Sequence, residues 1–469
     1  MDYLSNTLPF TIALKSSGGG DSIRCVQLLR SLPGKRLVYK GFWQNRAVLV
    51  KLFIDAKSSR RHWSREKAGV DALKNARITT PELIFSGLLT DDLPVLVFDF
   101  LPEAVTALSV WDELATATEQ RDFLRQLTSL LAVLHDQGLV QEDLHLENFL
   151  YSGEQLYAID GDTISIESNS APLDLKSSTR NLALLFAQLS PIFDDLLDDA
   201  SRHYAKLRNL SHQKLMSGLT SILPEIRRTR RHKYVKKSYR TCSEFVRISG
   251  AGQVAISRRD VQGVVLNRLL EDPDAFMCNG ETLKDGNTTT IVRVRSGHCD
   301  WVVKRYNIKN QWHVLSRCFR PTRAWLSWGN AHRLKISGIA TPRAVAMIEK
   351  RIGPLRSTGY YVCDFVDKPR ADVFFNDETV PPAIKEQAAK KFVLLFELFK
   401  KTGIYHGDCK AANFLPDRDI PWVLDLDAMR ECSSNVRFKK LFQEDRKRFL
   451  LNWRLLPELQ KWFDAHLPR

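Results

Sequence analysis

The chain has 469 residues, too many for one ordinary domain, and its 44% hydrophobic and 26% charged content is typical of a folded globular protein rather than a disordered one. No apolar run approaches the roughly 18–20 residues of a membrane span, and the N-terminal segment lacks the pattern of a secretory signal. The eight cysteines include no C-x-x-C pair, which argues against a zinc site or a disulfide framework and favours a reducing cytosol.

The net charge of +15 predicts an anionic partner, such as phosphate groups, nucleic acid or an acidic membrane face. The densest basic segment, residues 227–240, holds eight Lys or Arg residues and no acidic residue. It is either a solvated linker face or a surface for an anionic membrane leaflet. No nucleic-acid recognition motif accompanies these charges, so we do not expect nucleic acid to be the partner.

The first half begins with a predicted β-rich segment, residues 37–53, which is rich in β-branched and aromatic residues. A basic, helix-like stretch follows, and then a short strand that ends in Asp-Phe at residues 97–100. Leucines at helical spacing in 127–134 predict an amphipathic helix, and a polar loop and hairpin over 143–162 carry several aspartates. This order predicts a small mixed lobe followed by a helical lobe.

The second half repeats this pattern 265 residues further along (408 minus 143). In each half an aspartate precedes an Asn-Phe-Leu sequence by five residues and a second aspartate by seventeen, and another aspartate follows two positions later. The residues concerned are Asp143, Asn148, Asp160 and Asp162, and Asp408, Asn413, Asp425 and Asp427. The sequence therefore predicts an α+β protein of two tandem domains, residues 1–235 and 236–469.

The spacing of these residues is typical of phosphoryl transfer. Lys51 and Lys304, near the ends of predicted strands about a hundred residues earlier, are suited to bind phosphate oxygens as point charges. Asp143 and Asp408 are candidate catalytic residues that orient an acceptor hydroxyl and accept its proton. The residues two positions later, His145 and Lys410, are placed to offset the charge of the transferred group. Asn148, Asp160, Asn413 and Asp425 offer the hard oxygen ligands that Mg²⁺ prefers.

This constellation resembles the protein-kinase-like fold over nearly the whole chain, in two copies. His406 to Asn413 is similar to the family's H-x-D-x-K-x-x-N loop, whereas Asp143 to Asn148 has the D-x-H-x-x-N form found in kinases of small molecules and sugars. A metal-binding D-x-D takes the place of the Asp-Phe-Gly of protein kinases. The resemblance thus implies two bilobal domains and adds Asp162 and Asp427 to the magnesium ligands.

Residues 304–346 more narrowly resemble the lipopolysaccharide core kinases. Those enzymes phosphorylate heptose or 3-deoxy-D-manno-octulosonic acid (Kdo) in the inner core at the cytoplasmic membrane face. The resemblance implies an ATP- and Mg²⁺-dependent sugar kinase that is cytoplasmic, peripheral at the inner membrane, and has the lipopolysaccharide core or another anionic glycolipid as its partner. The alternatives are a protein serine/threonine kinase and a catalytically inactive tandem scaffold in envelope biogenesis. The oligomeric state is not predicted.

The two halves depart from the kinase pattern in different ways. Glu66 is the expected helix partner of Lys51, with a surface ion pair as the alternative, but Ser327 stands at the aligned position in the second half. Neither half has a glycine-rich G-x-G-x-x-G. Asp445 is expected to brace the second catalytic loop, and Thr179 occupies its place in the first half.

The part of the chain after Asp425 is short, with 44 residues (469 minus 425), and no Ala-Pro-Glu follows either metal aspartate. Protein kinases use a longer segment to dock a peptide. A small molecule or a glycan is therefore favoured over protein as the substrate.

Overall fold

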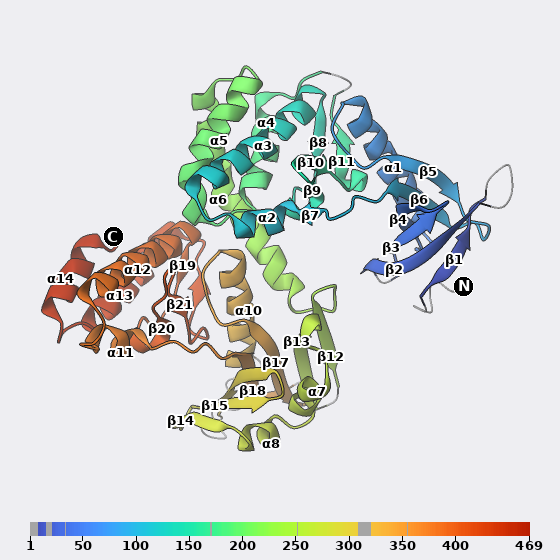
Figure 1. The fold of residues 1–469 in the computed structure, drawn as a ribbon. Helices are drawn as coiled ribbons and strands as arrows, with labels where there is room; N and C mark the ends of the chain where they lie inside the picture. Colours follow the sequence, from blue (N-terminus) through green and yellow to red (C-terminus); the bar gives the residue numbers. More distant parts are fainter. Residues whose placement is uncertain are drawn as a thin grey trace. The chain divides into compact units, whose positions relative to one another are not determined.

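The computed structural model describes residues 8–15, 21–32, 34–168, 171–250, 252–307, 320–353 and 355–469 (Figure 1). Residues 308–319, within the segment that resembles the core kinases, thus lie outside the described residues. The chain folds into two compact units, formed by residues 1–189 with 193–226 and by residues 190–192 with 227–469. Both contain helices and a sheet, so the expected α+β class is confirmed.

The first unit opens with a six-stranded antiparallel sheet in the order β1-β2-β3-β4-β6-β5. Lys51 in β4 lies opposite Val38 on β3 and Leu96 on β6. Helix α1 (Ser59–Asn75) packs against β4 and β6. The strands are β1 (Phe10–Ala13), β2 (Ser22–Leu32), β3 (Arg36–Trp43), β4 (Arg46–Phe53), β5 (Leu83–Leu88) and β6 (Pro94–Asp99).

The rest of the first unit is largely helical. Helix α3 (Ala117–Asp136) begins at a capping box formed by Thr116 and Glu119, and its buried face includes Leu127 and Leu131, as the helical spacing predicted. The other helices are α2 (Ala107–Glu113), α4 (Leu175–Phe186) and α5 (Asp194–Leu207). Short strands carry the polar loops: β7 (Val105–Thr106), β8 (Leu139–Gln141), β9 (Phe149–Ser152), β10 (Gln155–Ala158) and β11 (Ile164–Ile166).

Helix α6 (His212–Lys237) begins in the first unit and ends in the second, so the expected boundary at 235/236 lies inside a helix. The helix contains most of the basic segment 227–240. Its Arg231 is 5% exposed and donates hydrogen bonds to the Thr402 carbonyl at 3.0 Å and the Glu431 carboxylate at 2.8 Å. This part of the basic segment is therefore a packed helix and not a solvated linker.

The second unit has a seven-stranded antiparallel sheet in the order β12-β13-β17-β18-β16-β15-β14. Lys304 in β16 lies opposite Ile291 on β15 and Tyr361 on β18. The strands are β12 (Phe245–Ser249), β13 (Gln253–Arg258), β14 (Glu281–Gly286), β15 (Thr289–Ser296), β16 (Cys299–Tyr306), β17 (Ala344–Ile352) and β18 (Leu355–Asp364). The helices of this part are α7 (Val264–Glu271), α8 (Pro273–Cys278) and α10 (Arg323–Ile336).

The C-terminal part of the second unit is a helical layer with an aromatic core. Phe392 on α12 and Phe449 on α13 are fully buried and contact each other with ring centroids 5.4 Å apart. The helices are α11 (Ala371–Asn376), α12 (Pro382–Thr402), α13 (Asn435–Leu451) and α14 (Pro457–His466), and the short strands are β19 (Ile404–Tyr405), β20 (Phe414–Leu415), β21 (Trp422–Val423) and β22 (Arg430–Glu431). Across the described part of the chain, no helix has both the length and the apolar character that crossing a membrane requires.

Candidate active sites

The polar loop of the first unit is folded by its own backbone and by Asn148. The Asn148 side-chain amide donates to the Asp143 carbonyl at 2.8 Å, and the Asn148 carbonyl accepts from the Ile159 amide at 2.9 Å. Asp160 follows with φ = 68°, a left-handed conformation that turns the chain sharply after the hairpin. The loop therefore brings the predicted base, the predicted amide ligand and the metal aspartate to one place.

The second unit forms its loop with the same contacts. The Asn413 side-chain amide donates to the Asp408 carbonyl at 2.9 Å, and the Asn413 carbonyl accepts from the Leu424 amide at 2.8 Å. Asp425 has φ = 56°, which again places a non-glycine residue in the left-handed region. The spacing that the sequence repeats thus corresponds to a repeated loop conformation.

Glu66 is fully buried and forms an ion pair with Lys51, so the expected pairing is confirmed and the surface alternative is wrong. It lies on the buried face of α1 with Gly69, Val70 and Leu73, at helical spacing. A Cβ on Gly69 would meet the Gly161 carbonyl oxygen at 1.9 Å, so only glycine allows this close approach of α1 to the metal-aspartate turn.

A second cation, which the sequence analysis missed, lies in the same cluster. An Arg36 Nη lies 2.6 Å from a Glu66 carboxylate oxygen and 3.7 Å from an Asp160 carboxylate oxygen. Asp162 has other partners: its carboxylate lies 3.5 Å from Arg65 and 3.8 Å from His62.

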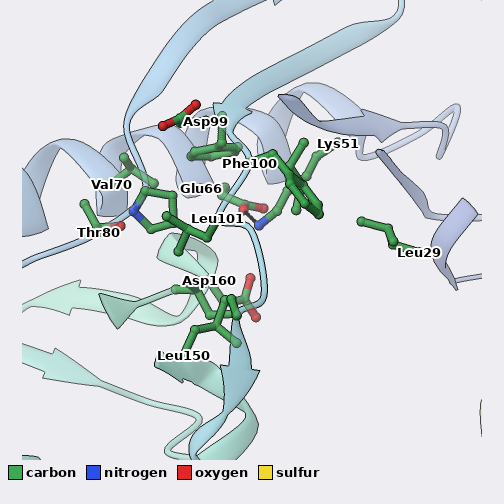
Figure 2. A pocket seen from close by; sticks show the side chains of 15 residues that line it. Leu29, Lys51, Glu66, Val70, Thr80, Asp99, Phe100, Leu101, Leu150 and Asp160 are labelled. Atoms are coloured by element: carbon green, nitrogen blue, oxygen red, sulfur yellow. Dashed lines mark hydrogen bonds and ion pairs between the residues drawn. The ribbon is translucent and has the colours of Figure 1, made fainter. Parts of the chain in front are cut away.

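A cavity of about 280 Å³ opens beside Lys51, Glu66 and Asp160 (Figure 2). Most of its wall is apolar, and the segment that follows β6 forms one side of it. The remaining lining residues include Leu29, Leu49, Val70, Phe98, Phe100, Leu101, Leu150 and Ile159. A mostly apolar hollow with charged groups at one end is suited to a ligand that has a flat apolar ring and an anionic tail.

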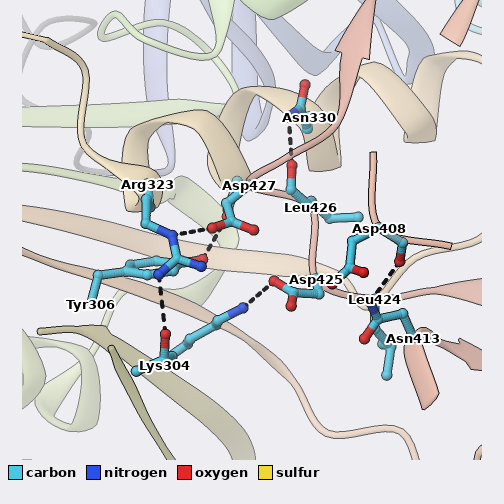
Figure 3. A network of polar contacts seen from close by, with 12 residues as sticks. Lys304, Tyr306, Arg323, Asn330, Asp408, Asn413, Leu424, Asp425, Leu426 and Asp427 are labelled. Atoms are coloured by element: carbon cyan, nitrogen blue, oxygen red, sulfur yellow. Dashed lines mark hydrogen bonds and ion pairs between the residues drawn. The ribbon is translucent and has the colours of Figure 1, made fainter. Parts of the chain in front are cut away.

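Lys304 in the second unit has a different partner. It forms an ion pair with Asp425 (Figure 3). Ser327 on α10, at the position aligned with Glu66, hydrogen-bonds the Tyr306 hydroxyl at 2.8 Å. Although burial opposes its charge, the neighbouring Tyr306, Asp425 and Asp427 raise the pKa of Lys304. Burial disfavours the Asp425 carboxylate, but the Lys304 ammonium outweighs burial and lowers the pKa of Asp425 to about 2.

Asp427 is held by Arg323, the first residue of α10, which also lies over the Tyr306 ring at 4.8 Å (Figure 3). Burial and the adjacent Asp425 carboxylate raise the pKa of Asp427. The buried Asp427 carboxylate and the partly exposed Asp425 carboxylate repel each other, and a bound cation would relieve that repulsion.

The two candidate bases also contact basic side chains. Asp408 lies 2.7 Å from Arg448 on α13 and 3.3 Å from Lys410, and Asp143 lies 2.9 Å from His145. The expected neighbours Lys410 and His145 are therefore in place. Arg448 was not predicted, since it has no spacing relation to the loop.

Asp445 braces the second loop as expected. Its carboxylate accepts hydrogen bonds from the His406 amide at 2.6 Å and the Gly407 amide at 3.0 Å. Thr179 does not do this in the first unit, because its hydroxyl donates to the Leu175 carbonyl of its own helix at 2.6 Å. Asn181 braces that loop instead, by donating to the Gln141 carbonyl at 2.8 Å.

The residues present fit magnesium in its usual protein setting. One carboxylate oxygen each of Asp160 and Asp162 is buried without a hydrogen-bond partner and lies near an arginine instead, Arg36 at 3.7 Å and Arg65 at 3.5 Å, so both oxygens already face positive charge as they would face a bound cation. The described residues contain no cluster of three or more His, Cys, Asp or Glu side chains arranged to hold a metal by themselves. Mg²⁺ typically takes one or two carboxylates and completes its shell with water and substrate phosphates, so such a cluster is not required.

Comparison with known families gives one match. Residues 279–448 match the lipopolysaccharide kinase (Kdo/WaaP) family. The resemblance inferred from the sequence is thereby confirmed for this segment, which contains Lys304, the loop from His406 to Asn413, Asp425 and Asp427. The match supports a kinase-type phosphotransferase in general. No curated protein is similar enough to the chain to count as a match.

Proposed function

We propose that the chain is an ATP- and Mg²⁺-dependent sugar kinase that phosphorylates heptose or Kdo in the lipopolysaccharide inner core. The observation that carries this proposal is the family match over residues 279–448, which includes the residues that the second unit gathers around Asp408. The family match supports the proposed substrate class, and the geometry supports the proposed roles of individual residues.

Asp408 is the proposed base of the second unit. It orients the sugar hydroxyl and accepts its proton as that oxygen bonds to the γ-phosphorus and the bond to the β,γ-bridging oxygen breaks. Arg448 and Lys410 hold its carboxylate in place, at 2.7 and 3.3 Å. Asp445, 5% exposed, fixes the loop backbone, so the carboxylate is presented on a rigid support.

Lys304, Asn413, Asp425 and Asp427 form the proposed phosphate and metal site of this unit. Lys304 would bind nucleotide phosphate oxygens, and Asn413, Asp425 and Asp427 would hold Mg²⁺. The metal, held by these residues, would supply positive charge to offset the charge that develops during transfer. In the present structure the lysine and the carboxylate of Asp425 are partners, so nucleotide binding exchanges partners within the cluster.

The first unit is proposed to be a second kinase-like domain. The matching contacts of the loops Asp143–Asn148 and Asp408–Asn413 support this, as does the Lys51–Glu66 pair. Lys51 would hold phosphates, oriented by Glu66, and the neighbouring cavity would take the base and ribose. Asp143 would act as the base with His145 beside it, and Asn148, Asp160 and Asp162 would hold Mg²⁺.

The chemistry of the whole chain favours an anionic glycolipid as the acceptor. The net charge of +15 is suited to phosphorylated core sugars and to an anionic membrane surface. We place the protein in the cytoplasm, peripherally at the inner face of the inner membrane, where the core is within reach.

The test is transfer of labelled γ-phosphate from ATP to purified lipopolysaccharide with an under-phosphorylated core. Wild type is run beside Asp143→Asn and Asp408→Asn, which remove a base while keeping its shape. Label in the core that Asp408→Asn abolishes supports the proposal and identifies the second unit as active. Loss of a different phosphate in each variant indicates that both units are enzymes.

Two outcomes contradict the proposal. Label in added protein but not in the glycan points to a protein kinase. If the protein neither transfers phosphate nor binds Mg-ATP, it is a non-catalytic scaffold. Binding is detected as added stability, because a nucleotide at a hundred times its Kd would add about 2.7 kcal/mol.

A further inference from the structure

The strand lysine of each unit has a guanidinium close by, and in neither unit does the family pattern explain it. We propose that Arg36 in the first unit and Arg323 in the second are nucleotide phosphate-binding residues that take over the work of the missing glycine-rich loop. This inference rests on the proposed function, because it assumes that a nucleoside triphosphate is the ligand of both units.

Arg36 is the first residue of β3 and follows directly on the turn from β2. Its side chain is 13% exposed and lies between two carboxylates, with Glu66 at 2.6 Å and Asp160 at 3.7 Å. Glu66 also binds Lys51, so one buried carboxylate is shared by two cations. This cluster therefore holds two positive side chains around Glu66, which lines the cavity together with Lys51 and Asp160, while Arg36 is not itself a lining residue.

Arg323 comes from a different element, the start of α10, and it too pairs with one of the carboxylates that follow the catalytic loop. It pairs with Asp427, lies over the Tyr306 ring, and donates from Nη1 to the Thr289 hydroxyl at 3.3 Å. Lys304 pairs with Asp425 in the same cluster, so again a lysine and an arginine share a group of carboxylates (Figure 3).

The strand registers show that the two guanidinium groups occupy corresponding places. Lys51 is opposite Val38, and Arg36 stands two residues before Val38 on the same strand. Lys304 is opposite Ile291, and Thr289 stands two residues before Ile291. Thr289, which Arg323 contacts, is thus the counterpart of Arg36 in the strand register. The first unit therefore has its guanidinium on a strand, and the second unit has its guanidinium on a helix that reaches the corresponding strand position.

The chemistry of the missing loop explains why a guanidinium would be needed there. A glycine-rich loop cradles phosphates with backbone amides, and neither half of this sequence contains one. A guanidinium fork can bind two phosphate oxygens at once and remains charged at any physiological pH. Of the carboxylates beside the two arginines, Asp160 and Asp427 are predicted to face Mg²⁺, whereas Glu66 is the predicted partner of Lys51. A metal–nucleotide complex can therefore bind by an exchange in which the metal takes the two aspartates and the arginines take phosphate.

The experiment is calorimetric titration of Mg-ATP and of adenosine into the full-length protein. The variants are Arg36→Gln, Arg323→Gln and the pair of them, with Arg36→Lys keeping the charge without the fork. The matched controls are Arg30→Gln, on the exposed face of β2, and Arg320→Gln, which is exposed just before α10. Melting of the nucleotide-free protein reports whether each variant folds.

We expect each glutamine variant to weaken Mg-ATP binding in its own unit by about tenfold or more, with adenosine binding unchanged, since a lost charge-assisted hydrogen bond to phosphate has this size. Arg36→Lys should fall between wild type and Arg36→Gln, and the controls should bind as wild type does. If the variants bind Mg-ATP like wild type and only melt earlier, the arginines are structural and the inference is wrong.

The remaining outcomes separate this inference from the proposed function. Suppose that the variants bind Mg-ATP more weakly but wild type puts no phosphate on lipopolysaccharide. That result supports the arginine sites and contradicts the proposed substrate. A wild-type protein that binds no Mg-ATP overturns both.

Discussion

Lys51 and Lys304 are both 15% exposed or less, and a lysine removed from water in this way needs a carboxylate beside it. Lys51 is paired with Glu66 on a helix, whereas Ser327 at that helix position leaves Lys304 to pair with Asp425. The first arrangement keeps Asp160 clear of the lysine. The second unit instead needs Lys304 to share or release Asp425 before that carboxylate can hold a cation.

Replacing Glu66 by glutamine tests how much the first unit depends on this single carboxylate. The change keeps the shape but leaves Lys51 and Arg36 beside a neutral amide in a buried place, so we expect stability to fall by about 3 kcal/mol. Urea denaturation measures this. Glu142→Gln is the matched control, because the Glu142–Arg65 pair is about half exposed and should contribute about 1 kcal/mol or less. Equal effects of the two substitutions would contradict the assigned role of Glu66.

Two glycines, Gly69 on α1 and Gly161 directly after Asp160, let the helix and the turn at Asp160 approach each other closely. A Cβ on Gly69 would lie 1.9 Å from the Gly161 carbonyl oxygen, and a Cβ on Gly161 would lie 2.5 Å from the Glu66 carbonyl oxygen. The position of Glu66 beside Lys51 and that of Asp160 therefore depend on the same backbone contact. A helix and a turn that approach so closely move together. A shift of either one therefore changes the positions of Lys51, Glu66, Arg36 and Asp160 relative to one another.

Gly69→Ala is expected to push α1 away from this turn. Alanine favours a helix by up to about 1 kcal/mol, yet the clash with backbone atoms should outweigh that gain and cost about 1–3 kcal/mol in total. Thermal unfolding gives the stability, and Mg-ATP binding should weaken with it. Gly252→Ala is the control, since nothing lies within 4 Å of a Cβ there. If Gly69→Ala changes neither the thermal stability nor Mg-ATP binding, the close contact between α1 and the turn is dispensable.

Over the whole molecule, the sequence predicted the loops and the strand lysines because their spacing is duplicated, and it predicted Glu66 and the Asp445 brace because they match the kinase pattern. Arg448 acts from a separate helix and has no spacing relation to the loop that it contacts. Asn181 lies 40 residues after Gln141, close to the 39 residues between His406 and Asp445, but it was missed because Thr179 stands where the brace was expected. Arg36 and Arg323 occupy unequal sequence positions, and only the strand register relates them.

Among the described residues, His135 in the first unit and His332 in the second are buried histidines whose pKa is lowered, and this predicts how the chain responds to acid. His135 is fully buried between the Tyr204 hydroxyl at 2.6 Å and the Asn181 side-chain oxygen at 2.9 Å, and burial lowers its pKa to about 4. His332, 1% exposed among aromatic rings in the second unit, has its pKa lowered by burial to about 3.

Both histidines fold in the neutral form, whereas an unfolded histidine takes up a proton near pH 6.5. The stability that each contributes is therefore complete above about pH 6.5 and is lost as the pH falls toward the folded-state pKa, by about 3 kcal/mol for His135. Urea unfolding at pH 7 and pH 4.5 should show this fall in both units. His135→Gln and His332→Gln cannot take up the proton, so each should flatten the pH dependence of its own unit and leave the other unit's unchanged. A pH dependence that survives both substitutions would assign the acid sensitivity to the carboxylates instead.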